Sequence, residues 1–389
     1  MPWKEVDTMT LRLEFVMLAR REDGNISSLC EFFGISRKTG YKWLNRFDAC
    51  EDAGLIDRSR RPHNSPFKSH ECVEASIVAL RKAHPAWGGR KIKSRLEKLG
   101  HHGVPAPSTI TGILHRHGLI SSDNSAKHKA FISFEHPYPN ALWQMDFKGH
   151  FAMRQGRCHP LTVIDDHSRF NLVLKACADE RTATVQAALI STFRRYGLPD
   201  RMTMDNGSPW GNDEFHKLTP LTAWLIRLGI GVSHSRPYHP QTQGKDERFH
   251  RTLNVEAISG RQFDDLAHCQ RQFDRFRGIY NLERPHESLG MNAPVTRYQV
   301  SPRPYPENLP DIEYGPGDHV RKVQANGEIS FKGKEFRVSK ALQGYPIAIR
   351  PTNIDSKYSL YYCHQRLIEI DLANANIKEK SVTHVPEHL

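Results

Sequence analysis

Apolar residues recur at helical spacing over the first 50 residues of the chain. Three amphipathic segments, 11–21, 25–34 and 37–47, show this period and are separated by short turns. In the third segment the expected outward residues are Arg37, Lys38 and Lys42, and the expected inward residues are Tyr41, Leu44 and Phe47. A basic last helix after a helix and a short turn is typical of a DNA-binding helix-turn-helix unit, and its three outward cations are candidate DNA contacts. A plain three-helix bundle is the alternative that the pattern leaves open.

A second helical unit follows a short basic linker. The linker, residues 58–70, is rich in Pro, Ser and Arg, and helices are expected at 73–85, 88–100 and 107–119. We interpret this unit as another helix-turn-helix. The candidate DNA contacts of the linker and of this unit are Arg58, Arg60, Arg61, Arg90, Lys91 and Lys93.

After residue 142 the pattern changes from helical periods to the alternation of strands. Short β-type runs and amphipathic helices follow one another in the order β-β-β-α-β-α-β-α. Strands are expected at 143–153, 158–168, 169–178, 200–207 and 230–238, and helices at 180–197, 215–229, 243–258 and 265–281. This order predicts a mixed α/β sheet with helices packed on it.

The end of the chain alternates short β runs with turns and follows a Pro-rich linker, which predicts a small all-β barrel. The chain is therefore expected to be a multidomain protein. The expected parts are a helix-turn-helix at 1–57, a linker at 58–70, a second helix-turn-helix at 71–122, a linker at 123–142, the α/β core at 143–298, a linker at 299–318 and the β-barrel at 319–375.

Charge and cysteine usage narrow the class of protein. The 389 residues carry a formal net charge of +12, and residues 58–98 hold 11 Lys/Arg against three Asp/Glu. Such a stretch fits a polyanion partner, and a solvated basic face is the plain alternative. Seven scattered cysteines argue against a disulfide framework and a structural zinc site. The chain has no apolar run long enough to span a membrane and no leader-like start, so an intracellular protein without membrane contact is expected.

Three acidic residues lie in three separate sequence motifs. Asp146 is in WQMDFKGH, Asp205 in RMTMDNGSPW and Glu247 in RPYHPQTQGKDERFHRTL. Two unit negative charges about 4 Å apart repel by roughly 4 kcal/mol at an effective dielectric near 20. If the fold brings the three carboxylates together, a divalent cation must neutralise them or they must take up protons. Hard oxygen ligands of this kind suit Mg²⁺ held against a phosphate.

Side-chain directions favour one crevice for these carboxylates. Strand alternation places Asp146 on the opposite face from its two neighbours, and Asp205 ends its strand, where ligands bind in open α/β sheets. In the later helix Glu247 lies about 200° from Phe249, so it can point away from the apolar row and toward the crevice. Asp246 competes for this role. Solvated strand-end aspartates and a surface Glu–Arg pair are the plain alternatives.

These motifs resemble the DDE transposases of bacterial insertion sequences, whose catalytic core is shared with retroviral integrases. The matching segments are WQMDF, LTVIDDHSRF, DNGSPW, RPYHPQTQGKDERFHRTL and YNLERPHESLGMNAP, in this order within residues 143–294. The resemblance implies an RNase H-like core in which Asp146, Asp205 and Glu247 are catalytic and bind two Mg²⁺ or Mn²⁺ ions. The 41 residues between Asp205 and Glu247 are more than many members of the family have there.

The resemblance also implies a reaction and partners. It implies a DNA transposase that binds transposon ends in double-stranded DNA and catalyses two-metal-ion strand cleavage and strand transfer. Such an enzyme is expected to act as a dimer or tetramer on DNA, in the bacterial cytoplasm. Lys245 and Arg248 flank the glutamate and are further candidate DNA contacts. A catalytically retired DNA-binding regulator and an RNase H-type nuclease remain alternatives.

Other polar residues in the matching segments are expected to have non-catalytic roles. Asp165 and Asp166 lie where a hairpin bends, which favours a turn or structural role. Packing or hydrogen bonding is favoured over phosphate contact for two histidines near the crevice, His234 and His239. The later motif contains residues that we interpret as structural or DNA-facing, namely Tyr280, Asn281, Arg284, Pro285 and His286.

Overall fold

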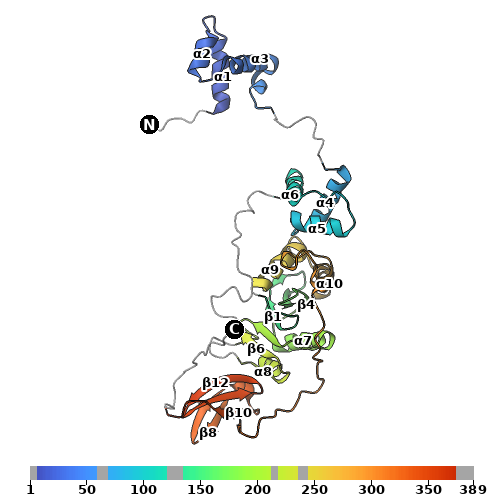
Figure 1. The fold of residues 1–389 in the computed structure, drawn as a ribbon, viewed down its shortest axis with the longest axis vertical. Coiled ribbons are helices and arrows are strands. Elements are labelled where there is room, and N and C mark those ends of the chain that lie inside the picture. The colour runs from blue at the N-terminus through green and yellow to red at the C-terminus, as the bar shows by residue number, and fades with distance from the viewer. Residues whose placement is uncertain (1–6, 59–68, 121–134, 212–217, 235–243, 374–389) are drawn as a thin grey trace. The chain divides into compact units, whose positions relative to one another are not determined.

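The structure, a computed structural model, describes residues 7–58, 69–120, 135–211, 218–234 and 244–373 (Figure 1). The chain divides into two compact units, Met1–Lys68 and Ser69–Leu389. Much of both predicted linkers before residue 142, including Arg60 and Arg61, lies outside the described residues. Within the described ranges, no helix combines the length and apolar character that a membrane crossing requires.

The N-terminal unit contains three helices, α1 (Thr8–Ala19), α2 (Ile26–Phe32) and α3 (Arg37–Gly54). Side-chain caps begin the last two of them. The Asn25 side chain accepts hydrogen bonds from two backbone N–H groups of α2, and Ser36 accepts one from the third residue of α3. The predicted helix, helix–turn–helix order is therefore present.

The buried face of α3 differs from the predicted one. Tyr41 is 51% exposed, whereas Trp43 and Phe47 are buried. A Cβ on Gly40 would lie 2.6 Å from the Cys30 sulfur, so glycine lets α3 approach α2 closely. Because Gly40, Trp43 and Phe47 form the row that faces α1 and α2, Tyr41 turns outward and the prediction for it was wrong.

The second unit begins with three more helices, α4 (Glu71–Ala83), α5 (Gly89–Lys98) and α6 (Pro107–Arg116). They enclose a small apolar core around Trp87, which is fully buried. A Cβ on Gly89 would lie 2.5 Å from the carbonyl oxygen of the first residue of α6, so this glycine permits the close α5–α6 approach. The predicted second helical unit is confirmed.

These helices contact the α/β core directly. Arg95 of α5 forms an ion pair with Glu283, and Lys98 donates a hydrogen bond to the carbonyl oxygen of Met291 at 2.7 Å. Ile279 packs against the apolar core of the helical unit. One side of α5 therefore contacts the segment that follows the last core helix.

The core is a mixed sheet in the strand order β2-β3-β1-β5-β6, with β4 paired to β3. The strands are β1 (Leu142–Phe147), β2 (Phe151–Ala152), β3 (Arg157–Asp165), β4 (Asn171–Cys177), β5 (Arg201–Met204) and β6 (Gly231–His234). The β1–β3 and β3–β4 pairs are antiparallel, and the β1–β5 and β5–β6 pairs are parallel. The predicted mixed sheet is confirmed, although the first predicted strand is divided into β1 and β2.

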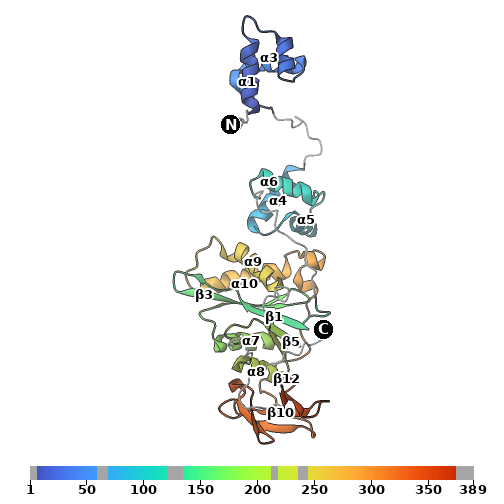
Figure 2. The same ribbon diagram turned by 90° about the vertical axis from the view of Figure 1, so that its left-hand side faces the viewer.

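Helices cover both faces of this sheet (Figure 2). One face carries α7 (Thr182–Tyr196) and α8 (Pro220–Arg227), packed around Trp143 and Met145 of β1. The other face carries α9 (Gly244–Leu253), a π-helical turn and α10 (Leu266–Leu282). Since β1 alternates, residues next to Trp143 and Met145 face the α9 side.

The C-terminal part is a small all-β domain, as predicted. Its four-stranded antiparallel sheet has the order β12-β11-β10-β7 and is accompanied by the β8–β9 hairpin. The strands are β7 (His319–Lys322), β8 (Glu328–Phe331), β9 (Lys334–Arg337), β10 (Pro346–Pro351), β11 (Lys357–Tyr362) and β12 (Gln365–Asp371). Ala223 and Ile226 of α8 belong to its apolar core, so the domain is packed onto the α/β core.

Candidate active site

The parallel pairing of β1 and β5 aligns the two predicted catalytic aspartates. Trp143 is paired with Met202 and Gln144 with Thr203. Continued by two residues, this register sets Asp146 beside position 205, immediately after the end of β5. Asp146 near the end of β1 and Asp205 just after β5 therefore lie at the same level of neighbouring strands, on the sheet face that α9 covers.

Asp205 is held by a local turn. The Gly207 N–H donates to its Oδ1 at 3.1 Å, and the His234 Nδ1–H donates to its carbonyl oxygen at 2.8 Å. A Cβ on Gly207 would lie 3.3 Å from the Asp205 carboxylate, so a side chain there would crowd the carboxylate. Burial raises the pKa of Asp205 above its ordinary value. The hydrogen-bonding role expected for His234 is thus present, whereas His239 lies outside the described residues.

Asp146 lies in an excess of negative charge. Its side chain is 24% exposed, and burial, followed by the charge of Asp205, raises its pKa to about 7. The charges of Glu180 and Glu247 act in the same direction, and a backbone hydrogen bond opposes them. A cation at this position would remove the repulsion and would favour the ionised carboxylate.

Helix α9 turns its two adjacent acidic residues in different directions. Glu247 is exposed, whereas Asp246 is 1% exposed and lies on the same buried side as Phe249. Glu247 therefore points away from the side of Phe249, as predicted, and its approach to the crevice stays a prediction. Residues 235–243, which lead into α9, lie outside the described residues.

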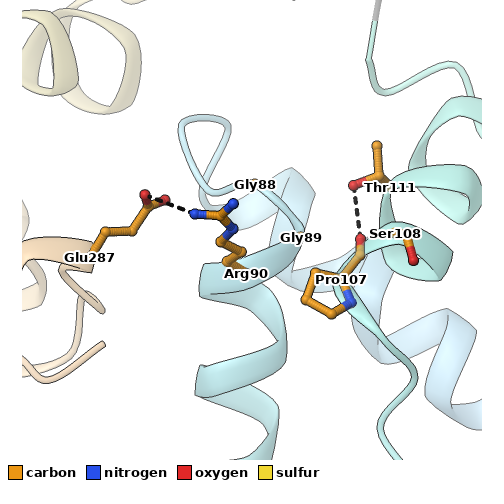
Figure 3. A pocket seen from close by; sticks show the side chains of 7 residues that line it. All are labelled: Gly88, Gly89, Arg90, Pro107, Ser108, Thr111 and Glu287. Carbon is orange, nitrogen blue, oxygen red and sulfur yellow. Dashed lines mark hydrogen bonds and ion pairs between the residues drawn. The ribbon is translucent and has the colours of Figure 1, made fainter. Parts of the chain in front are cut away.

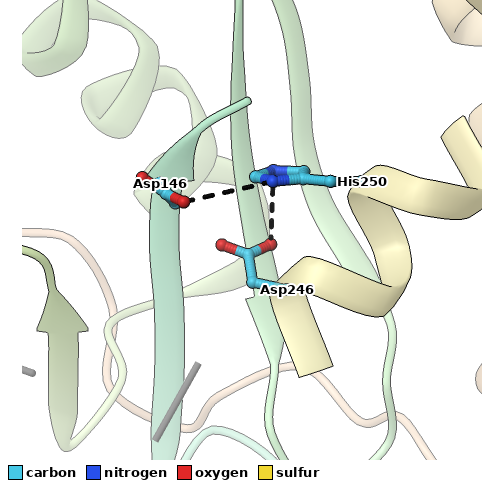
Figure 4. Close-up of side chains that lie close together, drawn as sticks. All are labelled: Asp146, Asp246 and His250. Atoms are coloured by element: carbon cyan, nitrogen blue, oxygen red, sulfur yellow. Dashed lines mark ion pairs between the residues drawn. The ribbon is translucent and has the colours of Figure 1, made fainter. Parts of the chain in front are cut away.

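Asp246 belongs to a buried polar cluster with Asp146 and His250 (Figure 4). One ligand atom of each residue lies within 4.8 Å of those of the other two. The Thr162 hydroxyl joins the cluster, since it lies 2.8 Å from His250 Nε2 and 3.2 Å from Asp246 Oδ1. Burial lowers the pKa of His250 to about 4, so the ring is neutral at pH 7. His250 is not among the residues predicted for the site, although its spacing of four residues from Asp246 places both on one helix face and was a visible signal.

The two aspartates of the hairpin bend have structural roles, as predicted. Asp165 accepts hydrogen bonds from the N–H groups of Asn140 and Ser168, at 2.6 and 2.8 Å. Asp166 is 2% exposed and forms an ion pair with Lys245. The ammonium group of Lys245 is thus already paired with a buried carboxylate of the protein, and a DNA contact at Lys245 stays a prediction.

The later motif is also internal. Tyr280, Asn281 and Arg284 are all buried. The Asn281 side chain accepts from the backbone N–H of Asn171 at 2.8 Å and donates to its carbonyl oxygen at 2.9 Å. These contacts tie α10 to β4, which supports the structural interpretation of this motif over the DNA-facing one.

The remaining candidate DNA contacts differ in exposure. Arg37, Lys38, Lys42, Arg58, Arg90 and Arg248 are exposed, and Lys93 is partly exposed beside Glu97. Lys91 is only partly exposed, burial lowers its pKa to about 8, and the charges acting on it are those of core residues such as Arg284, so a DNA contact there stays a prediction. The α5 face that contains Lys91 is thus directed toward the core.

A cavity of about 400 Å³ lies where α5 and α6 begin (Figure 3). Arg90 stands at its rim, 3.5 Å from Glu287 of the core. Its other lining residues are Gly88, Gly89, Pro107, Ser108 and Thr111. None of the predicted catalytic carboxylates lines it, so it is separate from the acidic site.

Sequence comparisons cover most parts of the chain. Two models described as integrase core domain match residues 136–240 and 228–294, and the model described as IS481 family transposase, C-terminal domain, matches 318–378. A helix-turn-helix domain matches 11–63 and a homeodomain-like domain matches 39–114. Together these matches support a bacterial insertion-sequence transposase with an integrase-type core.

The individual proteins to which this chain is similar are distant in sequence. The insertion element IS407 uncharacterized 31.7 kDa protein of Burkholderia multivorans is 24% identical over 63% of this chain and 87% of its own length. The putative transposase for insertion sequence element IS5376 of Geobacillus stearothermophilus is 21% identical over 93% of this chain and 88% of its own. The HTLV-2 integrase catalytic core domain in complex with magnesium is 13% identical, with a TM-score of 0.33 over 42% of this chain and 99% of that one.

Proposed function

We propose that this transposase binds the ends of its element and catalyses DNA strand cleavage and strand transfer at Asp146, Asp205 and Glu247. The observation that carries the proposal is the alignment of the two aspartates by the β1–β5 pairing, in a site where negative charge accumulates. Glu247 acts on the same site from the exposed side of α9. Phosphodiester chemistry needs cations beside the reacting phosphate, because negative charge builds up on its oxygens, and carboxylates are suited to hold such cations.

The carboxylates fit hard divalent cations. Oxygen donors suit Mg²⁺ and Mn²⁺, and burial and the neighbouring carboxylates raise the pKa of Asp146, an effect that a bound cation would oppose. We propose two such ions per site, held by Asp146, Asp205 and Glu247. When bound, they would lower the pKa of the attacking hydroxyl group and stabilise the departing 3′ oxygen.

The protein's own residues would bind and orient the DNA strands. In cleavage, a water oxygen bonds to phosphorus, the bond from phosphorus to the 3′ oxygen breaks, and a free 3′-OH results. In strand transfer, that 3′ oxygen bonds to a phosphorus of the target, and the target's own 3′ oxygen leaves with the proton. Asp146 and Asp205 fix the side of the sheet on which the phosphorus must lie. The exposed Arg248, next to Glu247, is suited to a phosphate contact.

Exposed cations of α3, together with Arg58 a few residues after its end, are proposed to contact duplex DNA. Arg37, Lys38, Lys42 and Arg58 are exposed, and the helix order is that of a helix-turn-helix unit. We propose that double-stranded transposon ends and target DNA are the partners. Joining two ends requires more than one core, so the protein is proposed to act as a dimer or tetramer on DNA.

The test uses purified full-length protein, Mg²⁺ and a duplex carrying the terminal DNA of the element. Asp205→Ala should bind this duplex as wild type does and should form neither nicked nor joined product. Asp264→Asn, which changes an exposed core aspartate, should retain both activities. Wild-type protein that binds without Mg²⁺-dependent nicking would instead indicate a retired regulator, and preferential cleavage of RNA–DNA hybrids would indicate a nuclease.

A further inference from the structure

The cluster behind Asp146 contains a buried acceptor that lacks a partner. Asp246 is 1% exposed, and its Oδ2 has no hydrogen-bond partner among the described residues. The carboxylate of Asp146 and the ring of His250 face the same space (Figure 4). An unpaired buried carboxylate oxygen is costly, particularly beside a second carboxylate.

The hydrogen bonds of Thr162 determine which nitrogen of His250 is available. The Thr162 hydroxyl has one proton and donates it to an oxygen that can only accept, either the Asp146 carbonyl oxygen at 3.0 Å or Asp246 Oδ1 at 3.2 Å. The His250 Nε2–H then donates to the Thr162 oxygen at 2.8 Å. We assign this tautomer from the network, and it leaves an unprotonated Nδ1 that lies 4.0 Å from Asp146 Oδ2.

We propose that Asp146, Asp246 and His250 bind a transition-metal ion of the Zn²⁺ class at a position separate from that of the proposed catalytic ions. Zinc lies about 2.0–2.2 Å from nitrogen and oxygen ligands, so one ion can bridge two ligand atoms up to about 4.3 Å apart. The 4.0 Å separation of His250 Nδ1 and Asp146 Oδ2 falls within that reach. The imidazole donor favours Zn²⁺ over Mg²⁺, and the Thr162 hydroxyl orients the ring as outer-shell partners of metal-bound histidines do.

The two proposed positions share Asp146. An ion at the Asp246–His250 position takes a carboxylate oxygen that the catalytic ions would use, so Zn²⁺ is expected to inhibit Mg²⁺-dependent DNA cleavage. Binding itself does not depend on catalysis. The proposed Zn²⁺ site and the proposed enzymatic function can therefore be refuted independently of each other.

Isothermal titration of metal-free, full-length protein with Zn²⁺ tests the proposal. His250→Ala and Asp246→Asn should each weaken the tightest Zn²⁺ site by about 100-fold or more, because each removes a direct ligand. Thr162→Val should weaken it by about 10- to 100-fold, the effect typical of outer-shell partners. Glu247→Gln should weaken this site far less than His250→Ala does, because Glu247 acts on it only through its charge. His268→Ala should leave it unchanged, since the Asp264–His268 pair has the same spacing but is exposed.

Two results would overturn the proposal. One is a His250→Ala protein that binds Zn²⁺ as tightly as wild type. The other is a Glu247→Gln protein that loses Zn²⁺ as fully as His250→Ala does, which would assign the ion to the catalytic position. If His250→Ala does not fold, Thr162→Val and anomalous scattering at the zinc edge from crystals of wild type decide the question, since an ion absent from His250 refutes it.

Discussion

Replacement of Asp146 by asparagine is expected to stabilise the metal-free protein at pH 8. The pKa of Asp146 is raised to about 7 in the folded protein, chiefly by burial and then by Asp205. In the unfolded chain an aspartate has a pKa near 3.9. The folded state therefore holds a proton that the unfolded state has lost between about pH 4 and pH 7. The free energy of unfolding falls as the pH rises through this window and stays reduced above it.

The magnitude follows from the size of the pKa shift. Three pKa units correspond to roughly 4 kcal/mol, and solvent at this partly exposed side chain reduces the figure to roughly 2–4 kcal/mol. About two of the three units fall between pH 5 and pH 7. The stabilisation by Asp146→Asn should therefore be larger at pH 8 than at pH 5 by roughly 1.5–3 kcal/mol.

Urea unfolding of metal-free protein, followed by the fluorescence of buried tryptophans such as Trp143, measures this difference at pH 5 and pH 8. Mg²⁺ at 100 times its dissociation constant should raise the free energy of unfolding of wild type at pH 8 by about 2.7 kcal/mol, and that of the variant by much less. Asp264→Asn serves as the control, because its carboxylate is exposed. The reasoning would be refuted if Asp146→Asn stabilised the protein by the same amount at pH 5 and at pH 8.

Three further outcomes are expected. Lys245→Met should lower the free energy of unfolding by about 3–5 kcal/mol, because it removes the cation that is paired with the buried carboxylate of Asp166; urea unfolding measures the loss, and a change below about 1 kcal/mol would contradict the ion pair. Phe193→Ala should lower the free energy of unfolding by about 3–5 kcal/mol, because it opens a cavity under α7. Thermal unfolding of the core measures this loss, and an unchanged unfolding temperature would mean that neighbouring side chains fill the cavity. If Lys38 and Lys42 contact phosphates, changing both to Gln should reduce the slope of log affinity against log salt by about 2, whereas an unchanged slope would remove them from the interface.

Much of the architecture could be predicted from local patterns. Strand alternation already separated Asp146 from the core residues Trp143 and Met145, and the position of Asp205 after a short strand indicated a strand-end site. These features depend on a period of two residues, which the chain carries regardless of its partners. The helical periods likewise predicted both helical units and the helices of the core.

The tertiary structure alone decided which polar residues have partners inside the protein. Lys245 is held by Asp166, which lies 79 residues earlier, and Lys91 faces charges of a distant segment. Asp246 and His250 meet Asp146 because apolar packing sets the rotation of α9, and Thr162 comes from yet another strand. Electrostatic and hydrogen-bond partners are set by distance in space, so a pattern along one segment cannot reveal them.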